Sequence, residues 1–109
     1  MKKKDRRIFE RFDVDFSAKL KQAEIRKQSP ANCFDVSATG IGVLTEEKLI
    51  PTPKLEVSVD IPDGYTPLRS GVRLIWTRKV REDKWRSGLE FKGISLMALR
   101  RVLDKQIKK

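Results

Sequence analysis

Apolar and polar residues alternate along most of the chain, which predicts β-strands over much of its length. The alternation is clearest in residues 55–61, where Leu, Val, Val and Ile take every second position. Comparable patterns predict further strands at residues 14–21, 33–36, 40–44, 68–76 and 85–91. About six strands joined by short turns favour an antiparallel barrel or a sandwich.

Turn-forming residues separate these predicted strands. The polar cluster of residues 28–32 predicts a turn, Pro51-Thr52-Pro53 a loop, and Pro62-Asp63-Gly64 a tight turn. Residues 81–84 are all charged and predict the tip of a hairpin. Gly40 and Gly42, inside a predicted strand, indicate a bulge or a close approach of another part of the backbone.

The two ends of the chain differ from this β-rich body. An apolar stripe at helical spacing predicts a C-terminal helix over residues 94–109, with Ser95 as its N-cap. The stripe consists of Leu96, Leu99, Val102, Leu103 and Ile107. Residues 1–12 are charged and largely aperiodic, and we expect them to form a mobile arm. The 109 residues therefore predict one domain, with its β-structure in residues 13–93.

The net charge of +10 lies mostly at the two ends. Residues 1–11 hold six Lys/Arg and two acids, and residues 100–109 hold five Lys/Arg and one acid. The body between them is nearly neutral, whereas a general nucleic-acid binder more often spreads basic residues over one face. Basic ends suit a local anion site or loose contact with a polyanion.

The chain has no histidine and a single cysteine, Cys33. This excludes Ser-His and Cys-His nucleophile pairs and argues strongly against a structural zinc site. It also excludes an internal disulfide, and a reducing cytoplasm is the expected location. No apolar run approaches the length of a membrane span. We therefore expect a cytoplasmic protein without catalytic activity, metal or cofactor.

The first candidate binding motif is Arg7-Ile8-Phe9-Glu10-Arg11, an Arg-x-x-x-Arg sequence preceded by Arg6. The arginine fork can donate two hydrogen bonds to the O6 and N7 atoms of guanine, or two to a phosphate. An arm that carries such arginines could close over a nucleotide. Taken alone, the motif fits a solvated basic tail, or an i, i+4 pair on a frayed helix, better than it fits a binding site.

The second motif is Asp35-Val36-Ser37-Ala38-Thr39-Gly40, which follows a predicted strand. Asp35 could accept hydrogen bonds from the N1 and N2 donors of guanine, Ser37 could donate to a phosphate or base, and Gly40 permits a turn. Taken alone, this motif fits an ordinary polar turn. Together, the two motifs indicate a guanine-nucleotide pocket without catalytic groups, as in a sensor.

With both motifs in this order, the sequence resembles the PilZ domain family, receptors for the bacterial second messenger cyclic di-GMP. The family signatures, Arg-x-x-x-Arg and Asp/Asn-x-Ser-x-x-Gly, are both intact. Residues 42–44, 71–76 and 87–91 also resemble strands of the family, the last two its Gly-x-Val-x-Trp and Gly-x-x-Phe segments. The resemblance covers roughly residues 6–105.

The resemblance implies a six-stranded antiparallel β-barrel with a C-terminal α-helix. It implies that Arg7 and Arg11 grip guanine and phosphate, with Asp35, Ser37 and Gly40 as the opposing wall. An arginine at the position of Arg6 is associated in the family with a stacked pair of ligand molecules, often with a homodimer. On binding, the arm would change conformation and present a new surface to an unidentified protein effector.

Two other functions remain open. A small RNA- or DNA-binding β-barrel would use the positive charge, with Trp76, Trp85 or Tyr65 as stacking surfaces. The near-neutral body argues against it, as do the strand positions of Trp76 and Trp85, which predict burial in the core. A PilZ-like domain that acts only through protein contacts is the other alternative, and the intact motifs argue against that version.

Overall fold

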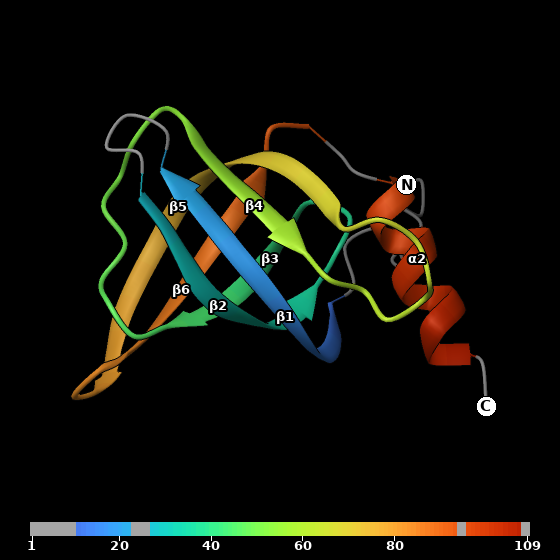
Figure 1. The fold of residues 1–109 in the computed structure, drawn as a ribbon, viewed down its shortest axis with the longest axis horizontal. Coiled ribbons are helices and arrows are strands. Elements are labelled where there is room, and N and C mark those ends of the chain that lie inside the picture. Colours follow the sequence, from blue (N-terminus) through green and yellow to red (C-terminus); the bar gives the residue numbers. More distant parts are fainter. Residues whose placement is uncertain (1–10, 23–26, 94–95, 108–109) are drawn as a thin grey trace, which may run out of the picture.

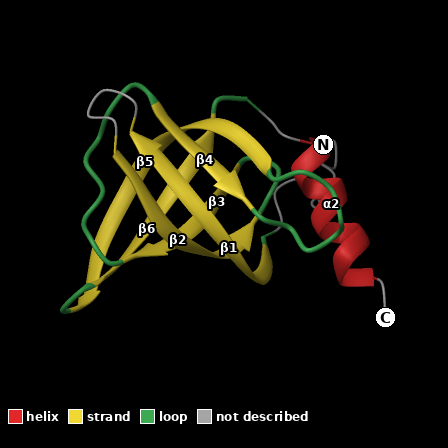
Figure 2. Ribbon diagram, in the orientation of Figure 1, coloured by secondary structure: helices red, strands yellow, loops and turns green. Residues whose placement is uncertain are grey.

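The computed structural model describes residues 11–22, 27–93 and 96–107, and these residues form a closed antiparallel β-barrel with one helix at its end (Figure 1). The strands are β1 (Phe12–Gln22), β2 (Lys27–Val36), β3 (Gly40–Thr45), β4 (Leu55–Val59), β5 (Leu68–Arg81) and β6 (Lys84–Phe91). Their order around the barrel is β1-β2-β3-β6-β5-β4. The helix, α2, spans Leu96–Ile107. The expected six-stranded barrel with a C-terminal helix is confirmed (Figure 2).

The core follows from the period-two alternation of the strands. In β1, Phe16, Ala18 and Leu20 are buried, and the residues between them are exposed. Strand β4 repeats the pattern and pairs with β1, so that Leu20 lies opposite Val57. Closure of the sheet leaves few unpaired strand edges, which allows a chain of this size to bury one continuous apolar core.

The predicted turn at residues 28–32 is wrong. These residues belong to β2 and pair with β1, with Gln28 opposite Lys21 and Asn32 opposite Ser17. Pro30 had suggested a break, but pairing with β3 begins only at Asn32. Proline is tolerated on such a stretch with a single neighbouring strand, because the position of its missing N–H can face away from that neighbour.

The expectation that both tryptophans lie in the core is also wrong. Trp76 is 41% exposed, and Trp85 is only half-buried. The β5–β6 register shifts between Leu74 and Trp76, so β5 carries one extra residue at this point. Because a one-residue shift exchanges the two faces of a strand, Ile75 and Trp76 both lie on the outside.

Helix α2 lies at one end of the barrel, beside the loop that follows β4 (Figure 1). Val102 is fully buried in the core, and the guanidinium of Arg101 binds the carboxylate of Asp63 with two hydrogen bonds of 2.7 Å. Leu96 was expected in the buried stripe but is 60% exposed. The helix is therefore fixed to the barrel through its middle, not along the whole predicted stripe. Ser95, its expected cap, lies outside the described residues.

No helix in the described part of the chain combines the length and the apolar character needed to cross a membrane.

Candidate functional site

The second sequence motif forms the end of β2 and the tight turn into β3. The N–H of Ser37 donates to the Gly40 carbonyl at 2.8 Å, and the Ser37 Oγ accepts from the N–H groups of Thr39 and Gly40 at 3.2 Å each. The Ser37 side chain is fully buried. Its hydroxyl therefore holds the turn together from within, as Ser side chains commonly do in turns.

Gly40 is required by a close approach of β6. It pairs with Glu90, and a Cβ atom at this position would collide with the carbonyl oxygen of Leu89. The Phe91 N–H also donates to the Thr39 carbonyl at 2.8 Å. The motif is thus attached to β6, which fixes the position of the turn relative to the rest of the barrel.

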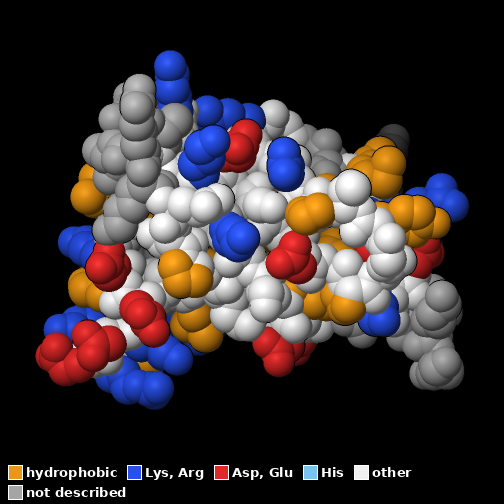
Figure 3. Space-filling view, viewed as in Figure 1, with side chains coloured by type: hydrophobic (Ala, Val, Ile, Leu, Met, Phe, Trp, Pro, Cys, Tyr) orange, Lys and Arg blue, Asp and Glu red, His pale blue; other side chains and the backbone are white. Residues whose placement is uncertain are grey.

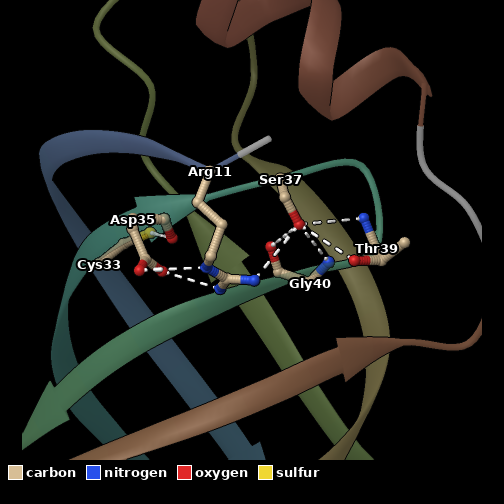
Figure 4. Close-up of polar contacts among 6 residues, drawn as sticks. All are labelled: Arg11, Cys33, Asp35, Ser37, Thr39 and Gly40. Carbon is tan, nitrogen blue, oxygen red and sulfur yellow. Dashed lines mark hydrogen bonds and ion pairs between the residues drawn. The ribbon is translucent and has the colours of Figure 1, made fainter. Parts of the chain in front are cut away.

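Arg11 joins the two motifs. Its Nε donates to Asp35 Oδ2 at 3.1 Å, and its Nη2 donates to Asp35 Oδ1 at 2.9 Å. Its Nη1 lies 3.4 Å from the Ser37 Oγ, so the guanidinium lies between Asp35 and Ser37 (Figure 4). The Arg11 side chain is 45% exposed and that of Asp35 is 18% exposed. The structure thus brings Arg11, Asp35, Ser37 and Gly40 together, while Arg6 and Arg7 lie outside the described residues.

A β-bulge directs Asp35 outward. The β2–β3 register shifts between Cys33 and Asp35, and Phe34 and Asp35 are both only partly buried between the buried Cys33 and Val36. The side chains of two consecutive residues, Phe34 and Asp35, therefore lie outside the core, and Asp35 is the one that binds Arg11.

Cys33, just inside this bulge, is chemically inert. Burial raises the pKa of its thiol to about 12, and the negative charge of Asp35 adds to the rise. The Sγ atom donates to the Asp35 carbonyl at 3.4 Å. A neutral thiol is a poor nucleophile, so the only cysteine offers no catalytic group to the site.

A groove of about 420 Å³ opens beside the Arg11–Asp35 pair. Its floor follows one row across four strands, because Asp35 on β2 pairs with Gly42, Gly42 pairs with Gly88, and Gly88 pairs with Trp76 on β5. Two adjacent glycines leave the middle of the floor without side chains. The groove is lined by Arg11, Phe34, Asp35, Thr39, Gly40, Gly42, Ile75, Trp76, Arg86, Gly88, Leu89 and Glu90.

Neither floor glycine can be replaced by a larger residue without a collision with a side chain in the wall of the groove. A Cβ atom at Gly42 would lie 2.5 Å from the Phe34 ring and 2.6 Å from the Asp35 Oδ1. A Cβ atom at Gly88 would collide with the Trp76 indole. The groove therefore has a flat backbone floor, Arg11 and Asp35 on one side, and Trp76 on the other.

Sequence reasoning missed Phe34, Trp76 and Arg86 as groove residues. Phe34 directly precedes the second motif, and this position in the sequence could have identified it as a groove residue. Trp76 and Arg86 join the groove only through strand register and the bulge in β5. A smaller hollow of about 220 Å³ between residues 22 and 50 contains none of the motif residues.

The described residues contain no cluster of carboxylate or thiol side chains that could hold a metal ion. The groove can instead offer a charged fork, a carboxylate acceptor, an aromatic surface and exposed backbone. This combination suits a flat, polar, negatively charged ligand.

Comparisons with known proteins agree with the resemblance seen in the sequence. The PilZ domain family model matches residues 5–108. None of the curated proteins matches the chain.

Solved structures of similar fold come from two bacteria. MotI/DgrA, the inhibitor of motility from Bacillus subtilis, is 18% identical with a TM-score of 0.67, over 91% of this chain and 50% of that one. YcgR from Escherichia coli in complex with c-di-GMP is 18% identical with a TM-score of 0.59, over 86% of this chain and 41% of that one. The PilZ domain of YcgR with c-di-GMP is 17% identical with a TM-score of 0.63, over 87% of this chain and 86% of that one.

The chain thus spans half or less of the first two proteins and most of the isolated YcgR domain. At these identities, the likeness to solved structures shows the fold alone.

Proposed function

The chain belongs to the PilZ domain family, and from this premise we propose that it is a receptor for cyclic di-GMP, which binds in the groove beside Arg11 and Asp35. The observation that carries the proposal is the contact between the two motifs. Arg11 and Asp35, 24 positions apart in sequence, form a bidentate pair at the edge of a glycine-floored groove. The YcgR structures of similar fold contain this ligand.

The residues of the groove fit the chemistry of a cyclic dinucleotide. Asp35 can accept hydrogen bonds from guanine N1 and N2, and the Arg11 fork can donate to guanine O6 and N7 or to phosphate. The bare floor at Gly42 and Gly88 allows a planar base to lie against the backbone. Ser37 and Gly40 act by holding the turn that positions Asp35.

Arg6 and Arg7 complete the proposed site from the N-terminal arm, which was predicted to span residues 1–12 but ends before Phe12, the first residue of β1. Arg7 grips guanine and phosphate together with Arg11, and Arg6 permits a second, stacked ligand molecule and a homodimer. The dianionic ligand draws the arm over the groove, because its phosphates offer charge-assisted hydrogen bonds to the arginines there.

The proposed receptor transmits its signal by changing its molecular surface when the ligand binds, and it catalyses no reaction. The closed arm and the bound ligand together form a face that a protein effector recognises in the cytoplasm. The protein performs no catalysis and uses no cofactor.

The central test is isothermal titration of the purified chain with cyclic di-GMP. We expect saturable binding that weakens at least about tenfold in Arg7→Ala, Arg11→Ala and Asp35→Asn, since hydrogen bonds to charged groups contribute about 1.5–3 kcal/mol. Arg100→Ala is the matched control, because its side chain is 80% exposed on α2 and it removes the same charge.

Absence of saturable binding by the wild type would refute the proposed function. Unchanged affinity in all three site variants would refute the site assignment alone. A stoichiometry of one ligand per chain would count against the stacked pair at Arg6.

A nucleic-acid-binding barrel remains the second candidate, favoured by one observation. Trp76 is exposed, and the Arg78 guanidinium lies 5.4 Å from its ring centre. Proteins that bind single-stranded nucleic acids use such exposed aromatic and basic side chains to stack on bases.

A further inference from the structure

Two arginines face each other directly across the β5–β6 ladder. Arg78 on β5 pairs with Arg86 on β6, two positions along from the Trp76–Gly88 pair. Both side chains are exposed and lie on the same outer face as Trp76. Like charges at directly opposite positions destabilise an antiparallel pair, because their Cβ atoms are only about 5 Å apart.

Neither arginine has a carboxylate partner among the described residues. The two acids that line the groove are occupied elsewhere, since Asp35 binds Arg11 and Glu90 binds Arg73 at 3.1 Å. Lys79 takes the nearest hairpin acid, Glu82, at 3.2 Å. The repulsion between Arg78 and Arg86 is therefore not offset by a side-chain anion in the described structure.

Aromatic rings hold both guanidiniums in place. The Cζ atom of Arg86 lies 4.4 Å from the centre of the Phe34 ring, and that of Arg78 lies 5.4 Å from the centre of Trp76. Cation–π contacts of this kind orient a guanidinium while leaving its N–H donors unused. The pair is therefore ordered and still able to donate hydrogen bonds.

The pair is continuous with the groove. Arg86 and both aromatic rings line it, and Arg78 is joined to it through its contact with the Trp76 ring. A ligand that lies on the floor at Gly42 and Gly88 thus lies in a groove that Arg11 and Arg86 both line.

We infer that Arg78 and Arg86 form a second phosphate-binding point, which takes a phosphodiester of the nucleotide in the groove. This inference rests on the proposed function, since cyclic di-GMP is the nucleotide named. One phosphodiester between the two guanidiniums accepts a fork from each side and removes their mutual repulsion. The affinity gained thus includes relief of a contact that is unfavourable in the free protein.

The test compares Arg78→Gln and Arg86→Gln with Arg81→Gln by titration with cyclic di-GMP. Arg81 lies on the same strand as Arg78 and carries the same charge, but it pairs with Lys84 at the hairpin tip and not with Arg86. We expect about ten- to hundredfold weaker binding in the first two variants and less than about fivefold in the control. The double variant should lose less than the product of the single losses, because both residues hold one anion.

A second readout separates this inference from the proposed function. Inorganic pyrophosphate is titrated while the Nε–Hε NMR signals of the arginines are followed. We expect the signals of Arg78 and Arg86 to shift together and that of Arg81 to stay unchanged, and Arg86→Lys to reduce the shift at Arg78 because lysine lacks the fork.

The outcomes are distinct. Binding of cyclic di-GMP that is equal in all three glutamine variants overturns the second phosphate point and leaves the receptor function intact. A wild type that binds no cyclic di-GMP but shows the pyrophosphate shifts overturns the receptor function and keeps the anion point. If Arg78→Gln and Arg86→Gln weaken only the binding of a single-stranded RNA oligonucleotide, the assignment to a cyclic dinucleotide is wrong.

Discussion

Arg11 and Asp35 neutralise each other in the free protein. Their two hydrogen bonds of 3.1 and 2.9 Å orient both side chains at the edge of the groove. Because Arg11 is 45% exposed, the pair contributes little to the stability of the fold. Its significance is positional: under the proposed function, a ligand meets an oriented donor and acceptor and competes with the contact between them.

The burial of Cys33 predicts that its thiol reacts slowly in the folded protein. Since burial raises its thiol pKa to about 12, almost no thiolate exists at about pH 8, where an ordinary cysteine is partly ionised. We expect the folded protein to react very slowly with a thiol-specific disulfide reagent and to react completely after unfolding in guanidinium chloride. The measurement is the absorbance of the released thiolate with time. Rapid reaction of the folded protein would contradict the burial of Cys33.

At the scale of elements, glycines decide how closely strands approach each other. Gly40 has no room for a Cβ atom because the Leu89 carbonyl of β6 lies against it. Gly71 on β5 is different, since a Cβ atom there would meet only Lys92 Cδ at 3.5 Å, an ordinary contact. The same substitution should therefore have opposite effects at these two positions.

We expect Gly40→Ala to lower the free energy of unfolding by about 1–3 kcal/mol, because β3 and β6 must separate to accommodate the methyl group. Gly71→Ala should leave stability unchanged or raise it by up to about 1 kcal/mol, since alanine reduces the entropy of the unfolded chain. Urea denaturation measures both. Equal effects in the two variants would show that the β3–β6 contact is not tight at Gly40.

The attachment of α2 depends on Asp63, in the turn after β4. Its hydrogen bonds from Arg101 are the main cause that lowers its pKa from 3.8 to about 2, and the Tyr65 N–H adds to the effect at 3.1 Å. A carboxyl whose pKa is lower in the folded state stabilises the fold above its unfolded pKa, and this contribution disappears as the pH falls through the folded value.

We therefore expect Asp63→Asn to lower the thermal midpoint by a constant amount above about pH 5. The difference from the wild type should shrink below that pH and vanish near about pH 1, below both pKa values of the Asp63 carboxyl. Thermal melts at a series of pH values measure this difference, and other carboxyl groups cancel because both proteins contain them. A difference that is independent of pH would mean that the ion pair with Arg101 does not fix the helix.

For the whole molecule, charge distinguishes the two candidate functions. The net charge is +10, but eight of these positive charges lie in residues 1–11 and 100–109. On the face shown in Figure 3, acidic side chains lie among the basic ones, including at the β5–β6 hairpin, and no single basic surface covers it. This distribution suits a small anion held by a few residues better than a long polyanion.

We expect a single-stranded RNA oligonucleotide to bind weakly and to lose most of its affinity between about 50 and 200 mM salt. Cyclic di-GMP carries only two phosphates, so the slope of its log affinity against log salt should stay at about two or less. Fluorescence anisotropy and calorimetry at several salt concentrations measure the two slopes. Tight RNA binding that persists in salt and ignores added cyclic di-GMP would favour the nucleic-acid function.

The local features of the chain could be predicted from sequence, because they depend on neighbouring residues. Alternation located most of the strands, and the helical spacing of the apolar stripe from Leu96 to Ile107 predicted the helix. The absence of histidine limited the chemistry, and the two motifs named Arg11 and Asp35 as candidates. The misassigned turn at residues 28–32 shows the limit: polar residues and Pro30 are typical of turns until a neighbouring strand provides hydrogen bonds.

Only the tertiary structure decided how these pieces meet. Register places Gly42 beside Gly88 and Arg78 opposite Arg86, and a single extra residue in β5 turns Trp76 from the core to the groove. Pairings between strands distant in sequence depend on closure of the whole barrel, and a shift of one residue inverts every side chain beyond it. The sequence by itself determined which residues are candidates for a guanine-nucleotide site, and the closed barrel determined which of the described residues share one groove.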